Sequence, residues 1–259
     1  MVNKIEKLSA IIIAKNEEKN IERCINSLLG CIDDIVVVVD NSSTDDTLKI
    51  VNKFNVNCLR SDWLGYAKTK TLALKNTKYN WVLWIDADEC LTRELKDELI
   101  NLKNKETEIA AYNIARRAFF LNKQIKHCGW YPGYVTRLFN KNLCKFNDNQ
   151  VHEQLIINGK IGKLKYDLEH YTDPNIKHYY NKFNTYTSLA ANELNNKKRN
   201  VGVGDLILRP LFLFIKMYII RLGFLDGYAG LILSVFSANY VFTKYAKLWE
   251  LKNINDKRT

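Results

Sequence analysis

Residues 82–89 read VLWIDADE, an apolar run that ends abruptly in three carboxylates. Val82 to Ile85 has the composition of a buried strand in a parallel sheet, so Asp86, Asp88 and Glu89 are expected at the carboxyl end of that strand. Open α/β sheets bind their ligands at this edge. Carboxylates gathered there need a cationic partner. A divalent metal ion that carries a phosphorylated ligand fits this requirement.

A second interpretation of the same acids is structural. Acidic side chains are favourable near the amino terminus of a helix, and Thr92 is a suitable N-cap for a helix that begins at Arg93. The stretch by itself is compatible with both a metal–phosphate site and an acidic helix start. Other motifs in the amino-terminal third of the chain favour the metal–phosphate site.

Two other apolar runs in that third also end in polar residues. Leu8 to Ala14 is followed by Asn16 and Glu17 and then by apolar residues at helical spacing. Ile35 to Val39 leads into the polar turn 40–45, DNSSTD, and a second helix. Short helical crossovers require parallel strands with right-handed connections. The sequence therefore predicts a nucleotide site on one rim of the sheet, built from Asn16, Glu17, Asp40, Asp45, Asp86 and Asp88.

The motifs AKNEEKNIERCINSLL (14–29), VVDNSSTDDT (38–47) and WIDADE (84–89), in this order and spacing, resemble the family 2 glycosyltransferases. These are inverting enzymes whose nucleotide-sugar domain has the GT-A fold. The similarity continues through GWYPGYVTRLFN (129–140), VHE (151–153) and HYYNKFNTYTSLAA (178–191). The fuller set is similar to the bacterial subgroup that adds a sugar during lipopolysaccharide core synthesis, including β-1,4-glucosyltransferases. The resemblance implies the reaction class and leaves the sugar open.

The resemblance also implies roles for residues of the donor site. Ala14, Asn16 and Glu17 would border the nucleoside, and Asp40 would contact the base. Lys70 falls where the family often has a basic residue near the base and the phosphates. Asp86 matches the first acid of the family's Asp-x-Asp motif, which holds the ribose and the metal.

Two positions depart from the family pattern. Ser42 stands where a glycine is common, and Thr71 follows Lys70 where asparagine is usual. A side chain at position 42 restricts any positive φ that the loop needs. A loop conformation that needs a positive φ at position 42 is therefore disfavoured in this chain.

The metal and the catalytic base complete the implied site. Asp88 matches the second acid of Asp-x-Asp, which would bind Mg²⁺ or Mn²⁺ bridging the diphosphate, and Glu153 matches the carboxylate that activates the acceptor. Pattern alone supports a different interpretation of Glu153, because residues 150–157 and 160–164 read as a hairpin with a tight turn at Asn158-Gly159. Glutamates on such strands are commonly solvated. Asp148 is the nearest alternative base. His152 is a candidate ligand for a metal ion or a phosphate, but a structural hydrogen bond with a neighbour is the favoured interpretation.

Composition is compatible with an intracellular enzyme. The chain has 259 residues, six cysteines without a C-x-x-C pair and a net charge of +11. We expect buried, reduced thiols rather than disulfides or zinc ligands. The segment MVNKIEKLSA lacks the apolar stretch of a secretory signal, which favours a cytoplasmic location. Basic chains often bind nucleic acid, but no helix-turn-helix, zinc-finger or aromatic RNA-binding signature is found, so no nucleic-acid partner is expected.

The carboxyl-terminal part has a different character. Asp173-Pro174 predicts a helix start with a capping aspartate. Further on, residues 206–222 are apolar but broken by charges, and the uncharged stretch 227–243 is at the lower limit of about 17 residues for a span. Two interpretations compete for this region: a helical pair packed as core, and a pair that lies in the membrane interface with basic side chains reaching anionic headgroups. A pair that spans the membrane is a third, less favoured interpretation. The net charge favours the second.

Together these features predict an α/β fold: a GT-A-like (Rossmann-like) catalytic domain with a mostly parallel sheet over residues 1–170, and a membrane-apposed helical extension over 171–259. The expected activity is metal-dependent, inverting transfer of a hexose from a nucleotide sugar, a UDP-hexose, to a lipopolysaccharide-core or related envelope glycolipid. The enzyme would work peripherally on the inner face of the cell membrane. The alternatives are transfer to a protein or polysaccharide, and nucleotide-sugar binding without catalysis.

Overall fold

The computed structural model describes residues 3–147 and 155–256. The chain divides into two compact units. The first unit contains Met1–Arg116 and Gly133–His170, and the second contains Arg117–Pro132 and Tyr171–Thr259. The second unit is therefore more than a carboxyl-terminal extension, because it takes in a segment from the middle of the chain.

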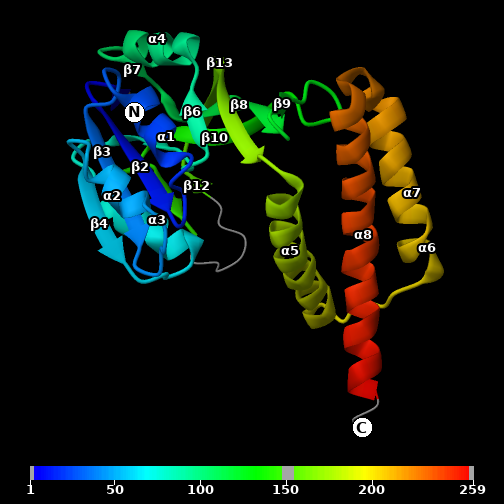
Figure 1. The fold of residues 1–259 in the computed structure, drawn as a ribbon. Helices are drawn as coiled ribbons and strands as arrows, with labels where there is room; N and C mark the ends of the chain where they lie inside the picture. Colours follow the sequence, from blue (N-terminus) through cyan, green and yellow to red (C-terminus); the bar gives the residue numbers. More distant parts are fainter. Residues whose placement is uncertain (1–2, 148–154, 257–259) are drawn as a thin grey trace. The chain divides into compact units, whose positions relative to one another are not determined.

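Four parallel strands form one half of the main sheet (Figure 1). β2 (Leu8–Ala14) lies between β3 (Asp34–Asp40) and β5 (Trp81–Trp84), and β4 (Asn57–Ser61) pairs with β3. Three of these strands are almost continuous apolar runs, as expected when both faces of a parallel sheet are covered. The strand predicted over Leu8–Ala14 is confirmed, and the other two predicted strands match β3 and β5 to within a residue.

The other half of the sheet is built from later segments of the chain. The full strand order is β4-β3-β2-β5-β10-β8-β13-β6, with β9 paired to β8. β10 runs antiparallel to both β5 and β8, and β13 runs antiparallel to β6. The predicted α/β fold is thus confirmed, with antiparallel strands added to the parallel half. These strands are β6 (Glu89–Leu91), β8 (Ile109–Phe120), β9 (Lys123–Gln124), β10 (Gly133–Asn140) and β13 (Lys160–Asp173).

Helices cover both faces of the parallel strands, and alternate side chains of β2 belong to different cores. Ile12 packs in a cluster with Ile25 of α1, whereas Ile11 packs in a cluster with Ala73 of α3. Burying each such side chain contributes roughly 1.5–3 kcal/mol. The first cluster also includes residues of α2 and α4. The helices are α1 (Ile21–Leu28), α2 (Thr47–Val51), α3 (Tyr66–Lys75) and α4 (Arg93–Leu102).

The predicted burial of the thiols and the predicted start of α4 agree with the structure. All six cysteines are free, and only Cys58 is not fully buried. The Thr92 hydroxyl accepts a hydrogen bond from Leu95 N at 3.2 Å and caps α4. Asp86 and Asp88 lie before β6, however, so they are not part of the first turn of that helix.

The prediction of a hairpin around Asn158-Gly159 is wrong. β12 (Leu155–Ile157) pairs with β11 (Cys144–Phe146) in a separate two-stranded sheet, and β13 continues into the main sheet. Leu155 and Ile157 pack against the core cluster that contains Phe146 and Ala73, which draws β12 away from β13. A short turn signal between two apolar runs does not reveal that each run has a better partner elsewhere. Another two-stranded sheet joins β1 (Asn3–Lys4) and β7 (Glu106–Thr107).

The second unit is mainly helical. α8 (Gly227–Asp256) packs against α5 (Ile176–Asn196) and against α7 (Leu208–Ile215), and the short α6 (Val203–Leu206) precedes α7. A π-helical turn over 216–220 and a 3-10 turn over 223–226 connect α7 to α8. Within residues 3–147 and 155–256, no helix combines the length and the apolar character needed to cross a membrane.

The predicted start of α5 is two residues too early. The cap is Asn175, whose side chain accepts from His178 N at 2.8 Å, rather than Asp173. The Asp173 carboxylate instead contacts the Thr172 hydroxyl and the His178 ring, both at 3.0 Å. The Asp173 oxygens are engaged by those side chains, and the helix is capped by Asn175 instead.

The turn before α8 brings two backbones into close approach. A Cβ added to Gly230 would overlap the Gly223 carbonyl oxygen, and one added to Gly223 would lie 2.7 Å from the Met217 carbonyl oxygen. Backbone atoms cannot move aside as a flexible side chain can. Glycine is therefore required at both positions for α8 to pack on the segment that precedes it.

We predict that Gly230→Ala destabilises the protein by at least about 1–3 kcal/mol, because overpacking against backbone forces the two segments apart. Urea unfolding followed by circular dichroism measures the effect. The matched control is Gly204→Ala in α6, where the nearest atom to an added Cβ is Leu208 Cδ1 at 3.7 Å. That variant should be as stable as wild type or up to about 1 kcal/mol more stable. Equal stability of the two variants would contradict the close packing described.

Candidate active site

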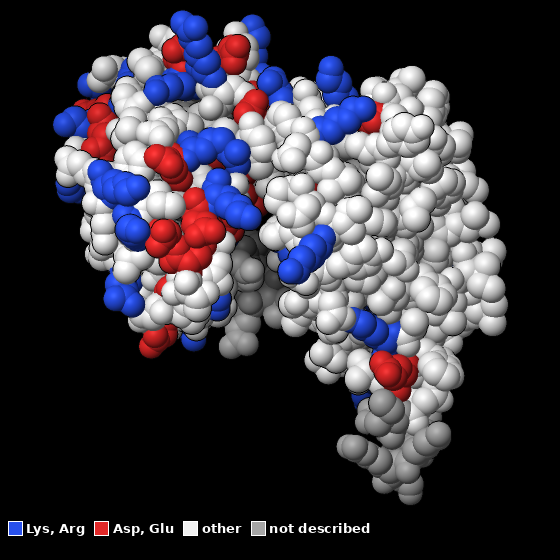
Figure 2. Space-filling model, viewed as in Figure 1, with Lys and Arg blue, Asp and Glu red and all other residues white. Residues whose placement is uncertain are grey.

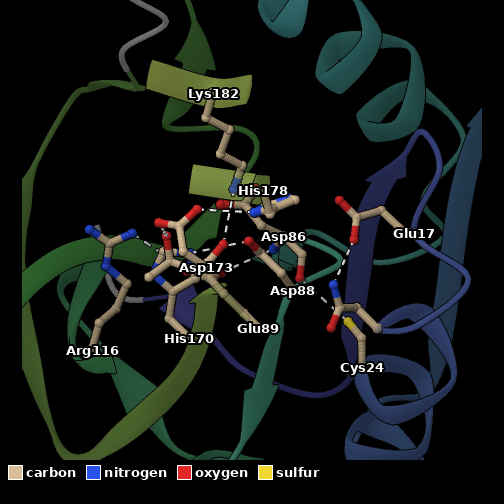
Figure 3. Close-up of polar contacts among 12 residues, drawn as sticks. Glu17, Cys24, Asp86, Asp88, Glu89, Arg116, His170, Asp173, His178 and Lys182 are labelled. Atoms are coloured by element: carbon tan, nitrogen blue, oxygen red, sulfur yellow. Dashed lines mark hydrogen bonds and ion pairs between the residues drawn. The ribbon is translucent and has the colours of Figure 1, made fainter. Parts of the chain in front are cut away.

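The loop after β5 holds three acids at the carboxyl edge of the parallel strands, where the sequence predicts them (Figure 3). Asp86 Oδ1 accepts from the Trp84 indole at 3.0 Å, and its backbone N–H donates to Glu89 Oε2 at 3.0 Å. Glu89 is fully buried. The hydrogen bonds with Trp84 and Glu89, which are near in sequence, thus fix the orientation of Asp86.

Arg137 of β10 joins two of these acids. It donates hydrogen bonds to Asp86 Oδ2 and, at 2.7 Å, to Glu89 Oε1, and its side chain is only 3% exposed. The register of β10 against β8 shifts between Thr136 and Leu138, so Arg137 is the extra residue of a β-bulge. Bulges change the direction in which a side chain points. The bulge places the guanidinium between the two carboxylates.

A tryptophan and a lysine complete this charged cluster. The Arg137 guanidinium lies 4.3 Å from the centre of the Trp84 ring, and Lys70 Nζ of α3 lies 3.6 Å from it. Lys70 is 2% exposed, which is rare for a lysine and implies compensation by nearby negative charge. Cation–π contacts of this kind contribute about 2 kcal/mol when they are desolvated.

The cluster separates the protonation behaviour of the two acids. Burial raises the pKa of Asp86, but the charges of Arg137 and Lys70 and the hydrogen bonds from Arg137 and Trp84 outweigh it and hold that pKa well below its usual range. Burial raises the pKa of Glu89 above its usual value, because Arg137 offsets it only partly and the Asp86 charge adds to it. Asp86 is therefore kept ionised at the edge of the sheet.

Asp88 has a histidine beside it. His170 Nε2 of β13 lies 3.4 Å from Asp88 Oδ2, and both side chains are partly exposed (Figure 3). The pairing of β13 with β6 sets His170 opposite Glu89, which explains its position next to Asp88. An oxygen and an imidazole nitrogen side by side are suitable donors for a divalent ion. Among the described residues no group of three or more such donors occurs.

The loops after β2 and β3 are tied to each other. Asn16, with a positive φ of 55°, accepts from Thr44 N at 2.8 Å, and Glu17 N donates to the Thr47 hydroxyl at 2.7 Å. Asp45 accepts from that same hydroxyl at 2.6 Å. Asn16 and Asp45, both predicted on the rim, thus shape the rim through contacts within the protein. Ala14 ends β2 and is buried, so it presents backbone rather than side chain to the rim.

Asp40 ends β3 and is buried. Its Oδ1 accepts from the backbone and the hydroxyl of Ser42, each at 2.8 Å, and Oδ2 lies 3.2 Å from Lys15 Nζ. Burial raises its pKa, but these contacts outweigh burial and lower it. Ser42 does not adopt a positive φ, so the departure from glycine causes no strain in this loop. The base candidates Glu153 and Asp148, and also His152, lie outside the described residues.

The family model for glycosyl transferase family 2 matches residues 9–161, more than half of the chain. The chain belongs to glycosyltransferase family 2. An uncharacterized glycosyltransferase of Rickettsia prowazekii (strain Madrid E) is 33% identical over 95% of this chain and 88% of its own length. The lipopolysaccharide core biosynthesis glycosyltransferase LpsC of Rhizobium meliloti (strain 1021) is 29% identical over 94% of this chain and 92% of its own length.

The fold comparison agrees with the family. A mannosyltransferase of Pyrobaculum calidifontis, PcManGT, superposes with a TM-score of 0.55 at 12% sequence identity and covers 94% of this chain and 87% of that one. At this identity the likeness concerns the fold alone. The GT-A-like architecture expected from the motifs is thus confirmed for this glycosyltransferase.

Two residues of the site escaped the sequence analysis. Arg137 and His170 come from β10 and β13, far along the chain from the motif that they contact. A signal existed for Arg137 in the sequence, because a charged residue stands among the apolar residues of β10. No comparable signal marked His170, whose place depends on the pairing of β13 with β6.

We predict that Arg137→Met destabilises the protein by about 3–5 kcal/mol at neutral pH, because two carboxylates then lose their buried counter-charge. Without Arg137 the pKa of each folded-state carboxyl rises above its unfolded value. The penalty is then present above the unfolded pKa of about 4 and fades as the pH falls below it. Denaturant unfolding of both proteins between pH 7 and pH 3.5 measures the difference.

The matched control is Arg116→Met. Arg116 lies 3.7 Å from the same Glu89 carboxylate but its side chain is 32% exposed. Its loss should cost no more than about 1 kcal/mol, as for other solvent-screened pairs. A stability gap for Arg137→Met that stays constant over this pH range, or that equals that of the control, would show that the guanidinium does not hold the acids.

Proposed function

We propose that this glycosyltransferase is a metal-dependent, inverting enzyme that moves a hexose from UDP to a glycolipid of the lipopolysaccharide-core type. The observation that carries the proposal is the ionised Asp86, held by Arg137 and Lys70 beside the Asp88–His170 pair at the carboxyl edge of the parallel strands. The likeness to LpsC over nearly the whole chain supports the acceptor class.

The donor nucleotide would lie along the rim formed by β2 and β3. Asp40 Oδ2 has no hydrogen-bond partner within the described residues, although Lys15 Nζ is at ion-pair distance. A buried acceptor oxygen of this kind suits the N3–H of a uracil base. Asn16, Glu17 and the backbone of Ala14 would border the nucleoside, and Asp86, fixed by its neighbours, would accept from the ribose.

A divalent ion, Mg²⁺ or Mn²⁺, fits the donor set of the site. Asp88 Oδ2 and His170 Nε2 supply two protein ligands, and such ions commonly take the remaining ligands from substrate phosphates and water. The imidazole favours Mn²⁺ over the harder Mg²⁺. PcManGT was crystallised with GDP-mannose and Mn²⁺. When bound, the ion would neutralise charge on the departing diphosphate.

The chain's own residues would carry the rest of the reaction. The acceptor hydroxyl gives its proton to the Glu153 carboxylate as its oxygen bonds to the anomeric carbon, while the bond from that carbon to the UDP oxygen breaks. Attack from the face opposite the leaving group inverts the configuration. Asp86 and Lys70 hold the donor in place for this displacement. Since a lipid-linked acceptor is confined to a bilayer, we place the enzyme on the cytoplasmic face of the membrane.

Asp88→Asn should weaken Mn²⁺-dependent binding of UDP by about tenfold or more, roughly 1.4 kcal/mol, because the ion loses an anionic ligand. Isothermal titration calorimetry with UDP, with and without Mn²⁺, measures the effect. Asp46→Asn is the control, because it removes the same charge from a carboxylate that is 64% exposed in a nearby loop. The metal assignment fails if Asp88→Asn binds Mn²⁺–UDP as tightly as the control does.

Glu153→Gln separates catalysis from binding. The amide keeps the size of the side chain but cannot take a proton, so transfer should fall by about 10²–10⁴-fold while UDP affinity changes little. Radiolabelled transfer from UDP-hexoses to core-truncated lipopolysaccharide, with Mn²⁺, measures turnover. Asp148→Asn is the comparison, with a smaller loss expected. Wild-type turnover in Glu153→Gln would assign the base elsewhere, and binding without transfer by the native chain would contradict the enzymatic proposal.

A further inference from the structure

The segment from Val203 to Tyr228 leaves many large apolar side chains in solvent. None of the residues of α7 is buried. Monomeric proteins rarely expose contiguous apolar patches of this kind without a partner. We call this surface the α7 face. Its large apolar side chains, each between 40% and 86% exposed, are Val203, Ile207, Leu208, Leu211, Phe212, Ile215, Ile219, Ile220, Leu222, Phe224, Leu225 and Tyr228.

The exposure is not a consequence of a loosely placed helix. Leu213 and Met217, on the opposite side of the same segment, pack in a cluster with Ala229 and Leu233 of α8. The exposed positions Leu208, Leu211, Phe212, Ile215 and Ile219 recur at helical spacing. The segment therefore has two apolar sides, and one of them remains after the core has been formed.

The charges on this surface are of one sign. Asp205 and Asp226, the two acids of the segment, are 7% and 4% exposed and are paired with Arg209 and His127, respectively. Lys216 and Arg221 are exposed and form no ion pair with any residue that the structure describes. In Figure 2 the helical unit shows a mostly uncharged surface with a few basic and a few acidic side chains. The α7 face thus combines apolar surface with cations only.

We propose that the α7 face lies in the headgroup region of an anionic lipid bilayer. Interfacial helices bury an apolar side about 5–10 Å deep, and basic side chains at their margin reach lipid phosphates. Each such cation near an anionic leaflet contributes attraction that salt screens. The inference deepens the proposed function, on which it rests, because the acceptor proposed there is anchored in a bilayer.

A second copy of the chain is a less suitable partner for this surface. A two-fold dimer would set the same patch against itself, so Lys216 and Arg221 would meet other cations with no exposed acid to pair with. The cores of protein interfaces are depleted of such charges. An anionic membrane satisfies both the apolar and the cationic side chains at once.

Flotation of the full chain with lipid vesicles tests the proposal. The protein should float with vesicles of phosphatidylethanolamine and phosphatidylglycerol at low salt, float less as salt rises to 0.5 M or so, and bind pure phosphatidylcholine more weakly. The double variant Phe212→Asp/Ile219→Asp should reduce the partition coefficient at least about tenfold, since two exposed apolar side chains no longer enter the lipid. Lys216→Glu/Arg221→Glu should abolish the preference for anionic lipid.

The matched control is Ile100→Asp/Ile161→Asp, which makes the same chemical change at two side chains of the first unit that are 43% and 51% exposed. It should float like wild type. Thermal unfolding verifies that each variant is folded, as expected for changes at exposed positions.

Two results would overturn the inference: a wild-type protein that stays unbound with anionic vesicles at low salt, or a Phe212→Asp/Ile219→Asp variant that floats like the control. Light scattering in solution reveals the competing occupant, because a dimer that this variant converts to monomer would assign the face to a second copy. Calorimetry with Mn²⁺ and UDP distinguishes the two proposals. A protein that binds UDP but not vesicles would contradict only the assignment of the α7 face to a membrane. A protein that binds vesicles but not UDP would contradict only the proposed function.

Discussion

The buried guanidinium of Arg137 between Asp86 and Glu89 is the interaction on which the edge of the sheet depends. Two carboxylates this close in a low-dielectric environment cannot both stay ionised without a compensating cation. Arg137 supplies that charge with help from Lys70, and it joins β10 to β6 and to the loop that follows β5. The organisation of the acidic motif is therefore a property of three strands, and not of the motif alone.

The two units use apolar surface in different ways. In the first unit the parallel strands are covered on both faces, and the large clusters around β2 are closed by helices. In the second, α8 has an inner partner on α7, while the outer side of α7 stays in contact with solvent. Burial of apolar side chains in the folded chain accounts for the arrangement of the first unit. The exposed side of α7 is the surface that we propose lies against a membrane.

The features that could be predicted from the sequence are those that depend on local residue pattern and on the direction of the strands. The strand over Leu8–Ala14 and the place of Asp86 and Asp88 follow from apolar runs that end in polar residues. Features set by distant partners were not accessible. Gly159 sits between strands that pair with other segments rather than with each other, and His170 reaches the site only through antiparallel pairing late in the chain. Local turn and periodicity signals carry no information about such partners.

The bulge in β10 makes the length of that strand as important as its composition. Side chains on a strand alternate between faces, so removing one residue near Thr136 would restore regular pairing with β8 and turn Arg137 toward the opposite face. The guanidinium would still be encoded but would no longer meet the acids. In a family member with one residue fewer here, the cation would have to come from a neighbouring position. A one-residue gap in an alignment of this strand therefore changes the face of the sheet to which the adjacent residues are assigned.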